Sequence, residues 1–311
     1  MYRIYWKPEE EKGAAADFIP YFDAGKFHLF YLYDHRNPKK YGEGIRWYKV
    51  ETSDFVHFES KGEMIPAGSR SDEDLCAFTG GIIKHKDVYH IFYTGHNVYI
   101  KDRAHQNECV MHAVSEDLTH WKKLKEHTFY APDGYDAGDF RDPHVYYDEE
   151  RGLFTMLLCA RPSAGERLRK GETIAMVSDD LCLWKFDRIV YAPAAYHTHE
   201  CPDMFRMGDW WYLIFSEYSD DYVTRYRMSK SPNGPWIKPA DDAFDGRAFY
   251  AAKTASDGEN RYLFGWNPTR LENSDYKPWM WGGNLITHKI IQHADGTLGV
   301  QIPDSVRSIF G

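Results

Sequence analysis

The sequence predicts an all-β protein, a β-propeller of five blades. Five runs rich in aromatic, β-branched or leucine residues each follow a polar or glycine-containing turn, which is typical of a strand after a hairpin. The runs begin at positions 25, 86, 151, 208 and 259, so their starts lie 51 to 65 residues apart. Helical periodicity with caps is hardly visible. A repeat of this length, built from short strands, favours a propeller over a sandwich.

Each run belongs to a larger repeated unit. In the first four units a strand, a Ser-containing polar turn and then Phe or Trp follow the run, at 48–59, 112–123, 175–186 and 226–237. The fifth unit, 285–300, is weaker and reads as a strand, an Asp-Gly turn and a strand. One more strand precedes each run, at 17–22, 78–84, 141–147, 200–206 and 250–256. These five preceding strands are expected to line the central channel, which gives four strands per blade.

The repeat also predicts which side chains share a level in the channel. Counting back from the matching core position of each run leads to, or beside, Asp17, Thr79, Asp142, Glu200 and Ala251. Three of these positions carry carboxylates, and buried carboxylates need partners or a chemical role. Strand alternation turns Cys201 away from the axis, and also Asp203 unless Pro202 interrupts the pleat. The alternative is that the acids form salt bridges at strand ends.

Converging carboxylates are what glycoside cleavage needs. One carboxyl must donate a proton to the leaving oxygen, and another must be ionised to attack the anomeric carbon or to activate water. Carboxyls about 5–5.5 Å apart indicate retention of configuration, and about 6.5–9.5 Å indicates inversion.

Composition restricts the possible partners. The chain has 311 residues and a formal net charge of −9, which argues against nucleic-acid or anionic-membrane binding. The N-terminus has no signal-peptide pattern, and the chain has no apolar run long enough to cross a bilayer. The five cysteines are dispersed without metal-ligand spacing, which predicts a cytoplasmic protein without metal or cofactor. We expect residues 1–311 to form a single catalytic propeller domain, with the oligomeric state left open.

Four segments carry a family resemblance. "FRDPHV" at 140–145 resembles the Arg-Asp-Pro motif of glycoside hydrolase family 32, the invertase, inulinase and levanase group, and "HECPDMF" at 199–205 resembles its Glu-Cys motif. "FTGG" with "VYHIFYTGHN" (88–97) is similar to the second-blade segment, and "WMWGGNL" (279–285) to the last-blade segment. The chain ends about 26 residues after this last segment, so the family's C-terminal β-sandwich is not expected.

The resemblance implies roles for the three acids. Glu200 would be the general acid/base, Asp142 would grip sugar hydroxyls beside Arg141, and Asp17 would be the nucleophile. The first segment departs from the family, because "AAADFIPYF" replaces Trp-x-Asn-Asp-Pro-Asn-Gly and lacks the asparagines that help to recognise fructose. The function expected is retaining hydrolysis of small β-fructofuranosides or related furanosides. An inverting family 43-like arabinofuranosidase or xylosidase and a non-catalytic sugar-binding propeller are the alternatives.

Further residues are candidates for binding a small oligosaccharide. Thr79 shares the level of the acids, and His96, like His35, follows an aromatic strand at the expected rim of the pocket. Trp266 and Trp281 either pack in the core or stack on sugar. Lys253 is expected to line the pocket and pair with an acid. The residues "HTHE" (197–200) include metal-ligand types, but alternation separates Glu200 from the two histidines.

Overall fold

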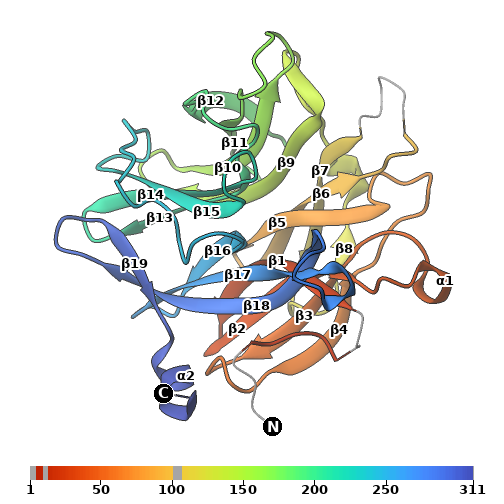
Figure 1. Cartoon of the computed structure of the whole chain (residues 1–311). Helices are drawn as coiled ribbons and strands as arrows, with labels where there is room; N and C mark the ends of the chain where they lie inside the picture. Colours follow the sequence, from red (N-terminus) through yellow and green to blue (C-terminus); the bar gives the residue numbers. More distant parts are fainter. Residues whose placement is uncertain (1–4, 10–12, 101–106, 311) are drawn as a thin grey trace.

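The computed structural model describes residues 5–9, 13–100 and 107–310, whose strands form five antiparallel blades around an axis, the first and fifth blades being joined in one eight-stranded sheet (Figure 1). The inner strands β1, β5, β9, β13 and β16 contact one another in a ring, because β1 contacts both β5 and β16, β9 contacts β5 and β13, and β13 contacts β16. The predicted five-bladed propeller is therefore confirmed.

The blades follow the order of the chain. The first contains β1 (Ala14–Asp23), β2 (Lys26–Asp34), β3 (Arg46–Thr52) and β4 (Glu59–Ile65). The second contains β5 (Cys76–His85), β6 (Val88–His96), β7 (Glu108–Ser115) and β8 (Lys122–Lys123). The third contains β9 (Tyr135–Asp148), β10 (Leu153–Pro162), β11 (Glu172–Ser178) and β12 (Lys185–Tyr191). The fourth contains β13 (Glu200–Met207), β14 (Trp210–Glu217) and β15 (Val223–Ser229). The fifth contains β16 (Tyr250–Ser256), β17 (Arg261–Arg270), β18 (Trp279–Gln292) and β19 (Leu298–Gln301).

Helices are few and short. They are α1 (Pro38–Tyr41), α2 (Asp304–Phe310), and the 3₁₀ turns η1 (Lys125–His127) and η2 (Leu271–Asn273). No helix of the described residues is long and apolar enough to cross a membrane.

The fourth blade differs from the predicted four strands. Outside β15 the chain makes only isolated bridges to it, Met228 with Ile237 and Arg225 with Ala243, among the described residues. Pro235 and Pro239 flank Ile237. Proline donates no backbone hydrogen bond, so this segment cannot extend a regular outer ladder.

The first and last blades are joined by backbone pairing. β18 is 14 residues long, and its Gly283 pairs with Ala15 of β1. Trp6, ahead of β1, bridges Leu285 of the same strand. These contacts hold the two ends of the propeller together.

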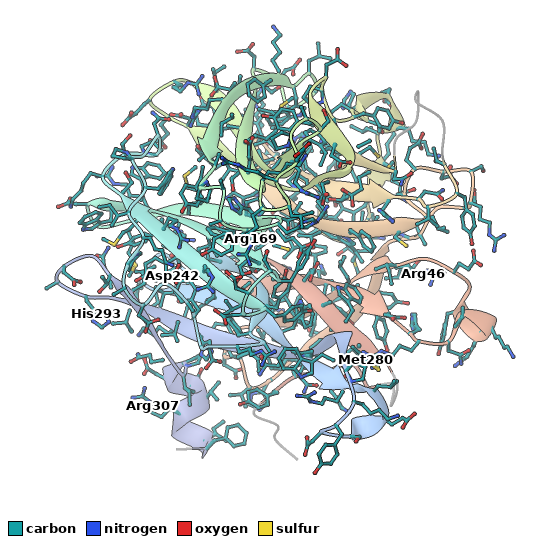
Figure 2. All side chains as sticks on the ribbon, turned by 45° about the horizontal axis from the view of Figure 1, so that its top comes forward. Arg46, Arg169, Asp242, Met280, His293 and Arg307 are labelled. Atoms are coloured by element: carbon teal, nitrogen blue, oxygen red, sulfur yellow. The ribbon has the colours of Figure 1, made fainter. Side chains whose placement is uncertain are left out.

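Apolar side chains fill the interfaces between blades (Figure 2). One cluster joins the first blade to its two neighbours and contains the fully buried rings of Phe30 and Trp47. The other three lie between the second and third, third and fourth, and fourth and fifth blades. Burying one such large side chain contributes about 1.5–3 kcal/mol, so the blades stabilise each other.

A repeated turn explains the Ser-containing signal in the sequence. After β3, β7 and β11 a hydroxyl accepts from the backbone N–H of an aspartate two residues later, as Ser115 does from Asp117. The aspartate in turn accepts backbone N–H groups of the turn. The next residue has a left-handed φ and is buried in each case: Phe55, Leu118 and Leu181. The aspartate side chain replaces strand hydrogen bonds while the apolar side chain anchors the turn.

A row of three neighbouring histidines in the second blade, with His112 buried in the middle, predicts acid sensitivity. His112 Nε2 lies 2.9 Å from His90 Nδ1, and its Nδ1 lies 3.0 Å from His127 Nδ1. Burial lowers the pKa of His112 to about 3, so the unfolded chain takes up a proton first when the pH falls below about 6.5. The free energy of unfolding should therefore fall between pH 7 and pH 5.

Replacing His112 with phenylalanine, which can still stack on Phe92, tests this pH dependence. Between pH 7 and pH 5 the wild type should lose on the order of 2 kcal/mol more stability than His112→Phe, measured by urea unfolding. The exposed His120→Phe is the matched control and should behave as wild type. Equal pH slopes in wild type and His112→Phe would contradict the assignment.

Candidate active site

Every inner strand has a β-bulge at the same level of the channel. The pairing register with the neighbouring strand shifts after Ala16, Ala77, Arg141, Glu200 and Tyr250. At each shift two residues of the inner strand oppose one residue of its neighbour. Four of the first bulge residues have a left-handed φ: Asp17 (45°), Asp142 (61°), Cys201 (52°) and Ala251 (52°). For non-glycine residues this conformation costs about 1–3 kcal/mol, and bulges of this kind redirect side chains near active sites.

The bulges correct the predicted alignment of the acids. Asp17 and Asp142 are equivalent, but Glu200 stands one residue earlier, at the position of Arg141 and Tyr250. Cys201 is the true equivalent of the two aspartates. It lines the same cavity, so the prediction that it turns away from the axis was wrong. Strand alternation failed because the bulge inserts an extra residue.

One cavity of about 530 Å³ contains the three predicted acids together. Asp17 comes from the first blade, Asp142 from the third and Glu200 from the fourth. The predicted convergence of the carboxylates is thus observed.

Asp17 is held by two hydrogen-bond donors. Trp266 Nε1 donates to its Oδ1 at 2.8 Å, and the Thr79 hydroxyl donates to its Oδ2. Burial raises the pKa of Asp17 to about 6, and the two hydrogen bonds oppose that rise. The carboxyl is therefore mostly ionised at neutral pH.

Asp142 is held by backbone and by the adjacent arginine. Its Oδ2 accepts from the backbone N–H of Cys201 at 2.9 Å and lies 3.9 Å from Arg141 Nε. Burial raises the pKa of Asp142 to about 7, with Arg141 opposing the rise and the charge of Glu200 adding to it.

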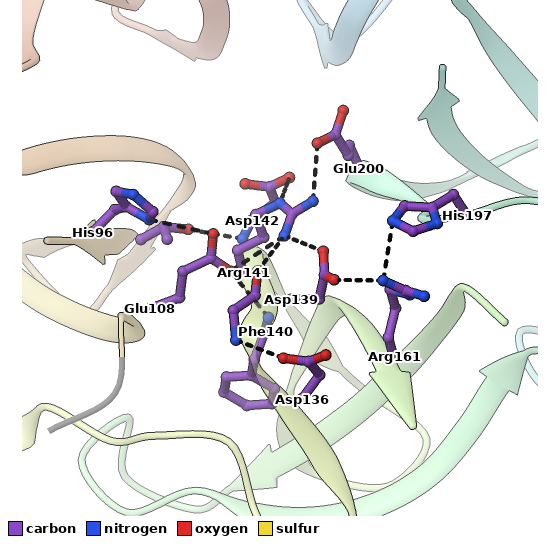
Figure 3. A network of polar contacts seen from close by, with 12 residues as sticks. His96, Glu108, Asp136, Asp139, Phe140, Arg141, Asp142, Arg161, His197 and Glu200 are labelled. Atoms are coloured by element: carbon purple, nitrogen blue, oxygen red, sulfur yellow. Dashed lines mark hydrogen bonds and ion pairs between the residues drawn. The ribbon is translucent and has the colours of Figure 1, made fainter. Parts of the chain in front are cut away.

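Arg141 connects Glu200 to a network of acids (Figure 3). Its Nη2 donates to Glu200 Oε1 at 3.0 Å, and its Nη1 donates to Asp139 at 2.7 Å and to Glu108 at 3.2 Å. The Tyr250 hydroxyl donates to the other oxygen of Glu200. These contacts fix the orientation of the Glu200 carboxylate.

The remaining predicted site residues have different surroundings. Trp281 lines the cavity and is 36% exposed, so its ring is available for stacking. Trp266 and Thr79 are buried and contact Asp17. His96 does not line the cavity, but its Nδ1 lies 3.4 Å from Oε1 of Glu108, which does.

Two predictions of position were wrong. His35 lines a separate surface pocket beside Arg46. Lys253 lines a second cavity beyond the bulge, where its Nζ donates to the Pro202 carbonyl at 2.8 Å. The extra bulge residue moves Lys253 past the level of the carboxylates.

Several lining residues escaped the sequence analysis. Tyr250 contacts Glu200 and stacks on Tyr222, with ring centroids 4.2 Å apart. Glu108, Asp139 and His197 also line the cavity. Tyr250 occupies the same register position as Glu200, so counting the bulge would have revealed it. Glu108 begins β7, Asp139 lies within β9 ahead of Arg141, and His197, considered from the sequence only as a metal ligand, lies in the loop before β13. The repeat aligns none of these positions.

The histidines of "HTHE" are engaged elsewhere. His199 is fully buried against Thr173, and His197 Nε2 lies 3.0 Å from Arg161 Nη1. Within residues 5–9, 13–100 and 107–310, no group of three or more histidine, cysteine or acidic side chains is arranged to hold a metal ion.

The Thr79 hydroxyl gives a testable effect on pH dependence. In Thr79→Val the ionised form of Asp17 loses one donor, which raises its pKa further. Any activity that needs ionised Asp17 should then have its acidic limb shifted upward by about 0.5–1 pH unit. The measurement is a pH profile of kcat/KM, with Thr155→Val, at a buried site away from the cavity, as control. An unchanged acidic limb would contradict the role of Thr79.

Known proteins resemble this chain in sequence and fold. A levanbiose-producing levanase of Bacillus subtilis (strain 168) is 27% identical over 282 residues, covering 84% of this chain and 46% of the levanase. The sucrose-6-phosphate hydrolase structure from Lactobacillus gasseri superposes with a TM-score of 0.77 at 20% identity, covering 95% of this chain and 62% of that one. A thermostable family-43 glycoside hydrolase superposes with a TM-score of 0.69 at 16% identity, covering 96% of each chain. The chain spans about half the length of the levanase.

Fold alone therefore does not separate families 32 and 43. The model of the glycosyl hydrolases family 32 N-terminal domain matches residues 19–301, which is most of the chain. The chain belongs to glycosyl hydrolase family 32.

Proposed function

We propose that this propeller hydrolyses the β-fructofuranosyl bond of small, sucrose-type saccharides with retention of configuration. The observation that carries the proposal is the single cavity lined by Asp17, Asp142 and Glu200, each held by different partners. The family match begins two residues after Asp17, so the role of Asp17 is supported by its contacts and by its bulge position, equivalent to that of Asp142.

In the first step an oxygen of ionised Asp17 attacks the anomeric carbon of the fructosyl unit. Protonated Glu200 donates its proton to the leaving oxygen as the bond breaks. The donors Thr79 and Trp266 keep the attacking carboxylate in place, which reduces the entropy cost of the reaction. The product of this step is a fructosyl ester of Asp17.

In the second step Glu200, now ionised, removes a proton from water. The hydroxide attacks the same carbon and releases Asp17, so two inversions restore the configuration. Asp142 accepts hydrogen bonds from sugar hydroxyls, and Arg141 orients Glu200. The Trp281 ring packs against an apolar sugar face.

The charge of the cavity favours an uncharged saccharide over a phosphorylated one. Its described lining contains five carboxylates, those of Asp17, Glu108, Asp139, Asp142 and Glu200. Arg141 is the permanent cation among the described lining residues, and it already contacts three of these acids at 3.2 Å or less. A phosphate group would therefore meet repulsion without a free partner.

We expect kcat/KM for sucrose to exceed that for sucrose 6-phosphate by at least about tenfold, a difference of roughly 1.4 kcal/mol. Both substrates are measured at the same ionic strength by fructose release. A preference for the phosphorylated sugar would contradict the charge argument while leaving the hydrolytic proposal intact.

The reaction is tested by following hydrolysis of a β-fructofuranoside by NMR before the product anomers equilibrate. The proposal predicts initial release of the β-anomer. Initial release of the opposite anomer would indicate an inverting, family 43-like mechanism. Binding of a furanoside in calorimetry without turnover on fructosides, arabinosides or xylosides would indicate a non-catalytic sugar-binding propeller.

A further inference from the structure

A second cavity, of about 270 Å³, lies beyond the bulges in the same channel. We call it the rear cavity, and its charged lining residues are His144, Asp203, Lys253 and Arg261. The first three occupy equivalent positions, directly after the bulges of β9, β13 and β16. The bulges therefore lie between two levels of inward-facing side chains, one in the carboxylate cavity and one in the rear cavity.

Lys253 brings a buried positive charge to the rear cavity. Its side chain is only 2% exposed, and its Nζ donates to the Pro202 carbonyl at 2.8 Å. Within the described part of the chain, Lys253 takes part in no ion pair. Asp203 and Asp17 are close enough for the charge of Lys253 to lower their pKa values, but neither forms an ion pair with it. A buried ammonium without a carboxylate in direct contact is costly, so an anion bound directly to Lys253 would be stabilised.

Arg261 adds a second cation to the same cavity. Its Nη1 donates to Thr254 Oγ1 at 2.8 Å, and its guanidinium lies 4.4 Å from the ring centre of Phe205. It forms no ion pair with any carboxylate of the described residues. Part of its donor fork is therefore left for a ligand.

Asp203 does not neutralise both cations. Its Oδ2 accepts from the Thr254 backbone N–H at 2.5 Å, and its Oδ1 lies 3.3 Å from His144 Nε2. Burial lowers the pKa of His144 to about 4, so this ring is neutral at pH 7. The charged lining then carries one negative and two positive side chains, a net charge of +1.

We infer that the rear cavity binds a single small oxyanion of the phosphate type, held by Lys253 and Arg261. Two cationic side chains exclude a metal ion, and the volume suits a free inorganic ion with a few waters. Arg261 supplies directional donors and Lys253 supplies a point charge.

The site would act on the catalytic carboxylates through Lys253. The positive charge of Lys253 lowers the pKa of Asp17, so an anion that neutralises this charge raises it. This consequence rests on the proposed function, whereas binding of the anion does not. Binding is therefore measured separately from activity.

The test is thermal unfolding and calorimetry of the full chain with sodium phosphate at pH 7, at an ionic strength held constant with sodium chloride. At phosphate about 100-fold above Kd, the wild-type Tm should rise by about 3–5 °C, with one phosphate bound per chain. Lys253→Met should lose this rise, measured against its own Tm in sodium chloride alone. Arg261→Gln should weaken phosphate binding at least about tenfold.

The exposed Lys122→Met, on the outer strand β8, is the matched control and should retain the phosphate effect. A wild-type Tm that responds equally to phosphate and chloride would overturn the inference. The same phosphate-dependent rise in both Lys253→Met and Arg261→Gln would also overturn it. Should Lys253→Met not fold, Arg261→Gln decides the outcome alone.

Discussion

Replacing Asp17 with asparagine is expected to lower kcat on β-fructofuranosides by about 10⁴-fold or more. The amide cannot attack the anomeric carbon, so the fructosyl ester does not form. Its oxygen can still accept from Trp266, and its NH₂ group can donate to Thr79, so the fold around position 17 is preserved. The measurement is the rate of fructose release at saturating substrate.

The same variant should keep or gain stability. The folded-state pKa of Asp17 is about 6, above its ordinary value of 3.8, so the ionised group destabilises the folded state as the pH rises from about 4 through 6. At pH 7 Asp17→Asn removes this penalty, which should increase the free energy of unfolding by on the order of 1–3 kcal/mol. If Asp17→Asn is inactive but unfolds at a higher urea concentration than the wild type, its loss of activity is not caused by a loss of stability.

Asp23→Asn, at the end of the same strand, is the matched control for Asp17→Asn. Asp23 accepts from the Tyr89 hydroxyl and lies outside the carboxylate cavity. This variant should retain wild-type activity. Retained activity in Asp17→Asn itself would show that another residue is the nucleophile.

The second large effect is expected for Glu200→Gln. Without the proton donor, kcat on sucrose should fall by about 10²–10⁴-fold. On a fructosyl donor whose leaving group needs no proton, bond cleavage should be affected much less, and the loss should lie in the second step. The Tyr250 and Arg141 contacts hold the side chain at position 200, so the glutamine is expected to keep its orientation.

Glu172→Gln in β11, whose carboxylate contacts Tyr135, is the control for Glu200→Gln. It should leave both steps unchanged. If Glu200→Gln slows bond cleavage of both substrates to the same extent, Glu200 positions the substrate and does not donate the proton.

The five-bladed fold was predictable because each blade repeats the same local sequence pattern. Aromatic strands, hydroxyl-and-aspartate turns and buried anchors such as Leu118 recur in order along the chain. The fourth blade lacks its predicted fourth strand because Pro235 and Pro239, after β15, prevent a regular outer ladder, and the repeat pattern does not reveal this effect. The five free cysteines are compatible with the expected cytoplasmic location, which stays a prediction.

The site was predictable at the level of its three acids but not of its register. A β-bulge adds a residue without a clear sequence signal, and one added residue reverses every later inward or outward assignment. For this reason the sequence predicts that Cys201 faces away from the axis and that Lys253 lines the carboxylate cavity. In the structure Cys201 lines the carboxylate cavity and Lys253 lines the rear cavity. The Trp266 indole donor to Asp17 joins residues 249 positions apart, a contact that only the closed ring creates.

The most direct test of the central claim is mass spectrometry of Glu200→Gln after incubation with an activated fructosyl donor. Loss of the general base slows the second step, so the covalent intermediate should accumulate. We predict one hexosyl adduct per chain, on the peptide that contains Asp17, and no adduct in the Asp17→Asn, Glu200→Gln double variant. An adduct on another carboxylate, or inversion of configuration by the wild type without any adduct, would contradict the account.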